Sequence, residues 1–282
     1  MPFPLEPAPR VEPAPRVPGH DGDPGDQPVD AHRHEHDQFD VQPFTPKCED
    51  LLVRGEHALI GVSPGNSYFT QGRLTQLLRW ATRRFAGVDL LYTDLHLDSM
   101  HRAQGADEQL AAKRTKRALR DVQRRIRRAM EELGRVSARV RTLALSETVD
   151  LPGYRTALRR VDEQLESNPR VHQACQEHVA FVLGDRVDPD NPRYRAALDY
   201  LRAELPYLLS TPEVLQVRSS VTCYHALLPV VEELHGEGSC FHPEQGHVVI
   251  RPRHSEPAKP DPASRTSEAG PGQPSPSAAP SV

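Results

Sequence analysis

A serine at the end of an apolar run is the first residue whose type and position could do chemistry. Residues 57–62 read His-Ala-Leu-Ile-Gly-Val, which is typical of a buried strand, and a predicted Ser63-Pro64-Gly65-Asn66 turn follows. A hydroxyl held where a strand breaks into a turn is exposed, and this position suits a nucleophile. The same position also suits an ordinary serine that caps the next helix, so these residues alone leave both interpretations open.

The most basic segment lies between Lys113 and Arg128 and carries nine cations but only one acid, Asp121. An apolar stripe at three- and four-residue steps predicts a helix with one packed face, and the cations occupy the remaining arc. Such a face repels itself unless an anion neutralises it, so we predict a surface that binds a nucleic-acid backbone. The stripe comprises Leu119, Val122, Ile126, Met130 and Leu133; the cations are Lys113, Arg114, Lys116, Arg117, Arg120, Arg124, Arg125, Arg127 and Arg128.

Other partners fit this helix less well. A merely solvated helix would alternate its charges. A helix on a membrane surface would have a wider apolar face with Trp or Phe, which this one lacks. Few aromatic residues interleave with the cations, so we expect contact with phosphates rather than with bases.

A third group of residues lies on a later helix, which Asn191-Pro192 predicts to begin at residue 192. Tyr200 and Glu204 lie four residues apart at the border of its apolar face. A partly desolvated carboxylate there could bind a substrate ammonium, or it could pair with Arg202 or Arg195. The Tyr224-His225 pair further on could relay protons or simply pack. The apolar face comprises Ala197, Leu198, Leu201 and Leu205.

The elements that must position these groups alternate between strands and helices. This alternation predicts an α/β fold, with a mostly parallel sheet flanked by helices. Functional residues in such folds gather at the carboxyl ends of strands, which is where Ser63 lies. The predicted strands are 57–62, 88–95, 140–145 and 247–250, and the first predicted helix is 68–84.

Proline and charge separate the two ends of the chain from its middle. Of 28 prolines, eleven lie in residues 1–46 and eight in residues 251–282, and neither end has a periodic apolar pattern. We expect 1–46 and 253–282 to be disordered tails and 47–252 to form one domain. The chain carries −4, residues 1–46 carry −6 and residues 253–282 are neutral, so the domain carries +2.

Cysteine and histidine usage indicates neither a disulfide framework nor a metal site. No Cys-x-x-Cys spacing occurs, and His32, His34 and His36 alternate in an acidic tail to which we assign no metal. The N-terminus lacks the pattern of a signal peptide, and no apolar run is long enough to span a bilayer, so we expect a cytoplasmic protein. The cysteines are Cys48, Cys175, Cys223 and Cys240.

Taken together, these features resemble the tRNA-dependent cyclodipeptide synthases. The resemblance runs through most of 48–252, and the joint occurrence of its four pieces in this order is specific. Asn66, Tyr224 and His225 match the branch marked by Asn, Tyr and His, which includes the albonoursin-pathway synthase. The pieces are Gly61-Val-Ser63-Pro-Gly-Asn66-Ser-Tyr68-Phe, the arginine-rich helix, Tyr200 with Glu204, and Cys223-Tyr224-His225.

The resemblance implies a Rossmann-like fold similar to the catalytic domains of class I tyrosyl- and tryptophanyl-tRNA synthetases. It further implies a transferase that uses two aminoacyl-tRNAs to form a 2,5-diketopiperazine, without cofactor or metal, as a monomer or homodimer. Aminoacyl esters are already activated, so ester exchange at Ser63 can divide the synthesis into easier steps. The arginine-rich helix matches the face that receives tRNA.

The resemblance also implies residue roles. Ser63 matches the nucleophile, and Tyr200 and Glu204 match the residues that hold the amino end of the first aminoacyl group. Tyr224 matches a residue that positions this group, and Asn66 and His225 match supporting residues. Tyr154 matches a further tyrosine of the catalytic pocket. The residues aligned with the first aminoacyl pocket are Leu59, Gly61, Leu145, Tyr207 and Thr222.

Two departures affect the expected substrates. Asp185-Arg186 stands where the family often has Asn-Arg, so Arg186 is kept beside an additional carboxylate. Tyr207 and Thr222 are more polar than the leucines of the albonoursin-pathway synthase. We therefore do not expect its Phe-Leu product to apply to this chain.

Two other functions compete with this hypothesis. Gly61-Val-Ser63-Pro64-Gly fits the nucleophile elbow of serine hydrolases, but that elbow needs the backbone N–H after the serine, and Pro64 has none. Losing one oxyanion donor costs about a hundredfold or more in rate. A non-catalytic RNA-binding protein of the same fold would keep the basic helix without needing Ser63, Tyr200 or Glu204, all of which are present.

Overall fold

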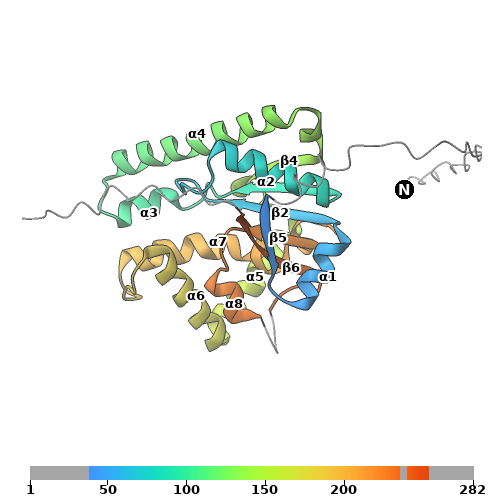
Figure 1. Cartoon of the computed structure of the whole chain (residues 1–282). Coiled ribbons are helices and arrows are strands. Elements are labelled where there is room, and N and C mark those ends of the chain that lie inside the picture. The colour runs from blue at the N-terminus through green and yellow to red at the C-terminus, as the bar shows by residue number, and fades with distance from the viewer. Residues whose placement is uncertain (1–37, 236–239, 254–282) are drawn as a thin grey trace, which may run out of the picture. The chain divides into compact units, whose positions relative to one another are not determined.

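A six-stranded sheet in the order β1-β6-β5-β2-β3-β4 is the centre of the computed structural model, which describes residues 38–235 and 240–253 (Figure 1). All neighbouring strands are parallel except β1 and β6, which are antiparallel. The predicted mostly parallel sheet is therefore confirmed. The strands are β1 (Phe39–Pro43), β2 (His57–Val62), β3 (Gly87–Tyr92), β4 (Val140–Ala144), β5 (Ser220–Tyr224) and β6 (Gln245–Pro252).

Strand β2 lies where the direction of strand addition reverses. After β2 the chain adds β3 and then β4 on one side, and later returns to place β5 on the other side. The carboxyl ends of β2, β3 and β5 therefore meet at a topological switch point, which is the usual ligand site of open α/β sheets. Strand β2 is buried along nearly its whole length, as expected for a parallel strand covered on both faces.

Helices α2, α3 and α4 lie on one side of the sheet (Figure 1). Thr70 and Asp107 accept hydrogen bonds from backbone N–H groups at the start of α2 and α4, which explains where those helices begin. The buried residues Val122, Ile126 and Ala129 of α4 join the core that includes the sheet and α2. The bounds are α2 (Gln71–Arg84), α3 (Leu97–Ala103) and α4 (Glu108–Leu133).

The other side of the sheet carries α5, α6, α7 and α8 (Figure 1). One core joins Leu59 and Leu91 of the sheet to α5 and α7. A second core joins α5, α6, α7 and α8 to one another. Asn191 caps α7 as predicted, and α7 bends at Ser210. The bounds are α1 (Pro46–Arg54), α5 (Pro152–Ser167), α6 (Pro169–Leu183), α7 (Pro192–Leu215) and α8 (Pro229–Leu234), with 3-10 turns at Gly134–Arg139 and Leu145–Glu147.

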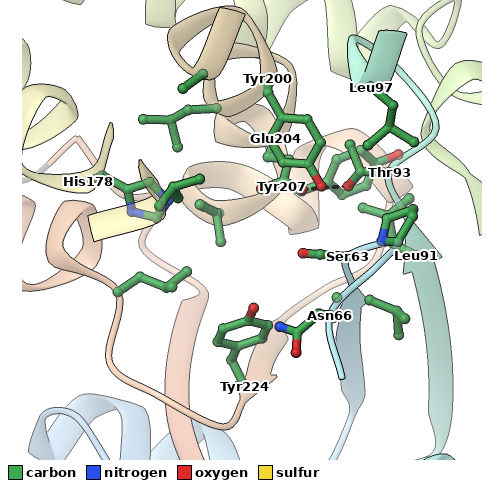
Figure 2. A pocket seen from close by; sticks show the side chains of 18 of the residues that line it. Ser63, Asn66, Leu91, Thr93, Leu97, His178, Tyr200, Glu204, Tyr207 and Tyr224 are labelled. Atoms are coloured by element: carbon green, nitrogen blue, oxygen red, sulfur yellow. Dashed lines mark hydrogen bonds between the residues drawn. The ribbon is translucent and has the colours of Figure 1, made fainter. Parts of the chain in front are cut away.

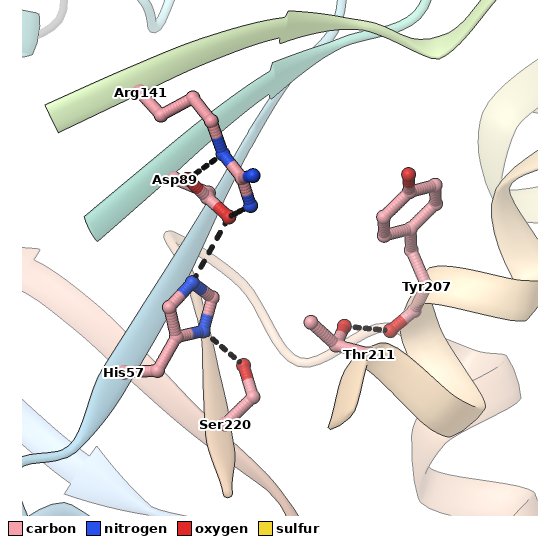
Figure 3. A network of polar contacts seen from close by, with 6 residues as sticks. All are labelled: His57, Asp89, Arg141, Tyr207, Thr211 and Ser220. Carbon is pink, nitrogen blue, oxygen red and sulfur yellow. Dashed lines mark hydrogen bonds and ion pairs between the residues drawn. The ribbon is translucent and has the colours of Figure 1, made fainter. Parts of the chain in front are cut away.

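A polar network joins four strands near their amino ends (Figure 3). Arg141 donates two hydrogen bonds to Asp89, of 2.9 and 2.6 Å. His57 bridges Asp89 and Ser220, at 3.1 and 2.9 Å. Burial alone would raise the pKa of Asp89, but the hydrogen bonds from His57 and Arg141 outweigh it and lower that pKa. The end of β2 remote from Ser63 is therefore held by a buried carboxylate.

Several predicted boundaries are wrong. The folded part begins before residue 47, because β1 pairs with β6 and lies within the segment predicted to be a tail. The first helix begins at Gln71 rather than Tyr68, and the second strand ends at Tyr92 rather than Leu95. The predictions for residues 1–37 and 254–282, including His32, His34 and His36, lie outside the described residues. Within the described ranges, no helix has the length and apolar character needed to cross a membrane.

Candidate active site

A cavity of about 450 Å³ opens at the carboxyl ends of the central strands (Figure 2). Ser63 lines it directly after β2, Thr93 directly after β3, and Tyr224 at the end of β5. Helix α7 contributes Tyr200 and Glu204, which lie across the cavity from Tyr224 (Figure 2). The sheet therefore gathers, in one cavity, groups that are far apart in the sequence.

The turn after β2 holds Ser63 at the edge of the cavity. The N–H of Asn66 donates to the carbonyl oxygen of Ser63 at 3.2 Å, which closes the predicted turn. Gly65 has a φ of +85°, a conformation that residues with a Cβ rarely adopt. The Asn66 side-chain oxygen then accepts from the N–H of Tyr68 at 2.9 Å. These two hydrogen bonds hold the turn without using the Ser63 hydroxyl, and Ser63 lines the cavity.

Two tyrosine hydroxyls interact with the Ser63 hydroxyl. Tyr200 of α7 and Tyr224 of β5 both lie beside Ser63, whose hydroxyl acts to lower the pKa of each phenol, and Asn66 acts in the same direction on Tyr224. Burial raises the pKa of both phenols, and the nearby Glu204 raises both further. Both phenols therefore keep their protons at neutral pH and can act as hydrogen-bond donors near the serine.

Glu204 has hydroxyl partners in the cavity and no pairing with the arginines proposed for it. Its Oε1 accepts a hydrogen bond from Thr93 at 2.5 Å, and the hydroxyl of Tyr200 lies beside it and also acts to lower its pKa. Arg202 pairs with Asp162 and Arg195 with Asp190, so the ion-pair interpretation of Glu204 is wrong. Burial raises the pKa of Glu204, and the two hydroxyls only partly oppose this. A buried carboxylate of this kind gains most from a substrate cation.

Other predicted site residues also line the cavity. His225 stacks on Tyr68 with ring centroids 4.1 Å apart and an interplanar angle of 27°. Burial lowers the pKa of His225, and Arg251 lowers it further. The Tyr-His pair thus combines packing with exposure to the cavity. The remaining predicted residues on its wall are Leu59, Gly61, Asn66, Tyr207 and Thr222.

Three predicted site residues do not line the cavity. Tyr154 is buried in α5, where its hydroxyl donates to the carbonyl oxygen of Ala203 at 3.0 Å, and it packs behind Tyr207. Leu145 is fully buried in the same core. Arg186 is exposed outside the cavity and pairs with Glu177 at 2.8 Å.

The cations of α4 differ in their partners and in their exposure to solvent. Arg124 pairs with Asp121, and Arg127 lies 3.7 Å from Glu131. Arg125 turns inward: its guanidinium donates to the carbonyl oxygens of Phe69 at 2.7 Å and Asn66 at 3.3 Å. The prediction that Arg125 lies on the exposed basic face is therefore wrong. The exposed predicted cations are Lys113, Arg114, Lys116, Arg117, Arg120, Arg124, Arg127 and Arg128.

Some cavity residues were missed by the sequence reasoning. Thr93 follows β3 directly, so the rule of carboxyl strand ends could have identified it. His178 and Phe181 come from α6 and His101 from α3, and no motif marks them. Within the described part of the chain, no cluster of three or more His, Cys, Asp or Glu residues could hold a metal ion.

Comparison with known proteins gives consistent matches. The family model described as cyclodipeptide synthase matches residues 39–252. Cyclo(L-leucyl-L-phenylalanyl) synthase from Streptomyces noursei is 40% identical over 209 residues, covering 72% of this chain and 87% of that protein. Cyclo(L-tyrosyl-L-tyrosyl) synthase from Mycobacterium tuberculosis is 34% identical over 220 residues, covering 76% of each protein.

Solved structures agree with these matches. A crystal structure of cyclo(L-leucyl-L-phenylalanyl) synthase has a TM-score of 0.72 at 37% identity, covering 76% of this chain and 99% of that one. A Mycobacterium tuberculosis protein has a TM-score of 0.70 at 34% identity, covering 77% of this chain and 94% of that one. The latter structure was described as demonstrating that cyclodipeptide synthetases are related to type I tRNA synthetases.

Proposed function

This chain belongs to the cyclodipeptide synthase family, and we propose that it joins two aminoacyl groups, delivered by two tRNAs, through an ester on Ser63. The observation that carries this proposal is the common cavity of Ser63, Tyr200 and Glu204, which combines a hydroxyl, phenolic donors and a carboxylate. The exposed cations of α4 supply a surface suited to the phosphates of tRNA.

The first step is an ester exchange. The Ser63 oxygen attacks the carbonyl carbon of the first aminoacyl ester, and the ribose oxygen of the tRNA leaves and takes the serine proton. An ester is formed as an ester is broken, so no further activation is needed. Glu204 binds the ammonium of the aminoacyl group, whatever its side chain is, and thereby orients the carbonyl toward Ser63.

Two aminolysis steps complete the synthesis. The ammonium of the Ser63-bound aminoacyl group first loses one proton to the Glu204 carboxylate, whose pKa burial raises, and Glu204 releases that proton to solvent. The free amine then attacks the ester of the second aminoacyl-tRNA, so an amide forms and the tRNA hydroxyl leaves with the proton that the amine loses. The amine of the resulting dipeptidyl group then attacks the Ser63 ester. This closes the six-membered ring and returns the proton to the serine oxygen. Tethering both ends in one cavity favours this closure.

The neighbouring residues support these steps. The phenols of Tyr200 and Tyr224 keep their protons, so they donate hydrogen bonds near the developing negative charge on oxygen. Asn66 lies beside Tyr224 and acts to lower its pKa, and His225 packs against Tyr68. Pro64 has no N–H to donate, which argues against a serine hydrolase at this site.

Product analysis tests the nucleophile directly. The full chain is expressed in a bacterium, and cyclic dipeptides in the medium are measured by mass spectrometry. Ser63→Ala is expected to abolish them, whereas Ser67→Ala, an exposed serine in the same loop, is expected to leave them unchanged. Equal product from Ser63→Ala and wild type would exclude the covalent route. No product from purified wild type supplied with charged tRNAs would favour a non-catalytic RNA-binding protein.

A further inference from the structure

A second hollow lies on the outer side of α3. Helix α3 packs against α7 on one side and against α4 on the other (Figure 1). Four of its residues or flanking residues line the active-site cavity, namely Leu97, Met100, His101 and Gln104. Asp98 instead lines a groove of about 540 Å³ between α3 and α4. Helix α3 therefore separates the active-site cavity from this second hollow, which we call the α3–α4 groove.

The α4 side of the groove combines an apolar surface with two cations. Leu119 is half-buried and packs against the core of the sheet. Lys116 and Arg120 are exposed, lie one helical turn apart, and form no ion pair with a described residue. The groove can therefore hold a flat apolar face and anionic groups at the same time. Its other lining residues are Ala112, Thr115 and Gln123.

Asp98 is the acid among the residues that line the groove. Its Oδ2 accepts a hydrogen bond from Arg102 at 3.0 Å, and the two side chains are 49% and 51% exposed. An exposed ion pair of this kind contributes little to stability. A carboxylate beside Lys116 and Arg120 also weakens their attraction for phosphate. Asp98 can therefore favour binding of an anionic ligand only if that ligand also donates a hydrogen bond to it.

The groove lies on the path of an RNA end, given the proposed function, on which this inference rests. The aminoacyl ester must reach Ser63 inside the cavity, while phosphates of the tRNA bind the cations of α4. A double helix is too wide to enter a cavity of about 450 Å³, so only unpaired nucleotides at the 3′ end can cross α3. Unpaired nucleotides are also the part of an RNA whose base edges proteins can recognise.

We propose that the α3–α4 groove binds one unpaired base of the tRNA 3′ end, and that Asp98 accepts a hydrogen bond from the exocyclic amine of that base. The 3′ end of a tRNA is CCA, and cytosine and adenine both carry such an amine, which is a suitable donor to a carboxylate. Leu119 offers an apolar surface to the face of the base, and Lys116 and Arg120 bind the flanking phosphates. This base contact adds to the phosphate contacts that the sequence predicts.

The experiment measures base preference rather than overall affinity. Labelled RNA stem–loops with a 3′ CCA end bind purified full-length protein, and fluorescence anisotropy gives the Kd. Three further RNAs replace the first cytosine by uracil, the second cytosine by uracil, or the adenine by hypoxanthine. Each of these changes replaces one exocyclic amine by a carbonyl oxygen, which a carboxylate repels. The readout is the Kd of each changed RNA divided by the Kd of the CCA RNA.

The variants are Asp98→Asn, Asp98→Ala and Asp121→Asn. Asp121 pairs with Arg124 on the same basic helix but does not line the groove, so it controls for the loss of one negative charge. With wild type, one of the three base changes is expected to raise the Kd about tenfold. Asp98→Ala should lower that ratio to about one, and Asp98→Asn should lower it at least as far, because an amide also donates to a carbonyl oxygen. Asp121→Asn should keep the ratio within about twofold of wild type, since it removes no base contact.

Two results would overturn the inference and leave the proposed function intact. One is an equal Kd of all four RNAs for wild type, which would mean that no base of the 3′ end is recognised. The other is a preference that both Asp98 variants retain, because the base would then be recognised elsewhere. If none of the stem–loops binds wild type, the proposed use of tRNA fails, and the inference fails with it.

Discussion

Glu204 and Thr93 are joined by a hydrogen bond in the lining of the cavity. The Thr93 hydroxyl donates to Glu204, and this bond stabilises the charged carboxylate against the burial that raises its pKa. A substrate ammonium would stabilise the same charge. Thr93 is therefore well placed to set the pH at which Glu204 can bind an amine.

The pH dependence of catalysis tests this arrangement. Because the pKa of Glu204 is raised, its charge is lost at a higher pH than that of a solvent-exposed glutamate. We expect kcat/KM to be constant above that pKa and to fall as the pH drops through it. Thr93→Val removes the stabilising hydrogen bond, so it should move the fall to higher pH, whereas Thr93→Ser should not. Coincident profiles for wild type and Thr93→Val would show that this carboxylate does not limit the reaction.

Residue types in the sequence indicated the chemistry of the site, but not which side chains line the cavity and which are buried behind its lining. Strand ends and helix borders marked Ser63, Tyr200 and Glu204 as candidates, but only the resemblance to cyclodipeptide synthases assigned these three residues to one site. Tyr154 and Leu145 lie one layer behind it, and neither periodicity nor resemblance separates a lining residue from its supporting neighbour. His178 was missed because a histidine in an apolar helix looks the same whether it packs or faces a cavity.

At the scale of elements, α4 contacts the loop that carries the nucleophile. Arg125 bonds to the backbone of residues 66 and 69, in the loop that joins Ser63 to α2. The helix thus has an exposed basic face and one cation turned toward the active site. The charge count predicted the basic face correctly, but a count cannot show which arginine at the edge of the apolar stripe turns inward.

Arg125 and Arg128 are therefore expected to behave differently when changed to alanine. Arg128→Ala removes an exposed cation, so it should weaken tRNA binding and lower the slope of its logarithmic salt dependence by about one. Arg125→Ala releases the loop, so it should slow single-turnover catalysis about tenfold or more, the size of a lost charged hydrogen bond, with the salt slope unchanged. Arg125→Lys should recover part of the rate. A salt slope lowered equally by both alanine variants would place Arg125 among the phosphate contacts.

The boundaries of elements were the least predictable part of the fold. Tyr68 and Phe69 extend the helical pattern toward the strand, but Phe69 is buried by the loop and Thr70 caps the helix one residue later. Thr93 continues the strand pattern, yet its hydroxyl bonds to Glu204 beyond the end of β3. Both errors arise where the chain leaves regular structure to build the cavity. The strand order also depends on long-range pairing that local periodicity does not contain.

At the scale of the whole molecule, β2 connects two polar centres. Ser63 follows its carboxyl end, and His57 begins it within the network around Asp89. The network links β4 to β2, β3 and β5, and the last three of these strands line the cavity. Removing its carboxylate should therefore affect folding more than chemistry.

Asp89→Asn tests whether the network around Asp89 affects stability without affecting catalysis. The change leaves Arg141 and His57 without their shared anion, and loss of a fully buried ion pair costs about 3–5 kcal/mol. Because the Arg141 side chain is 55% exposed, we expect a smaller loss of about 2 kcal/mol in urea unfolding. The rate per folded molecule should remain close to wild type. Asp121→Asn, in an exposed pair with Arg124, should change stability by less than about 0.5 kcal/mol. Equal stability of the two variants would contradict a structural role for Asp89.

The cavity has one wall with the strand residues Leu59 and Leu91 and another with the α6 residues His178 and Phe181, and this has a consequence for how such an enzyme could diversify. The strand residues and α6 belong to different cores, although α5 and α7 contribute to both, so a substitution on α6 can be absorbed among helices without disturbing the strands that hold the nucleophile. The preference for one of the two amino acids could then change while the preference for the other stays constant. If each wall sets the preference for one of the two amino acids, the number of possible products is the product of the two sets of preferences. A few substitutions on each wall would therefore give many different cyclic dipeptides from one unchanged reaction centre.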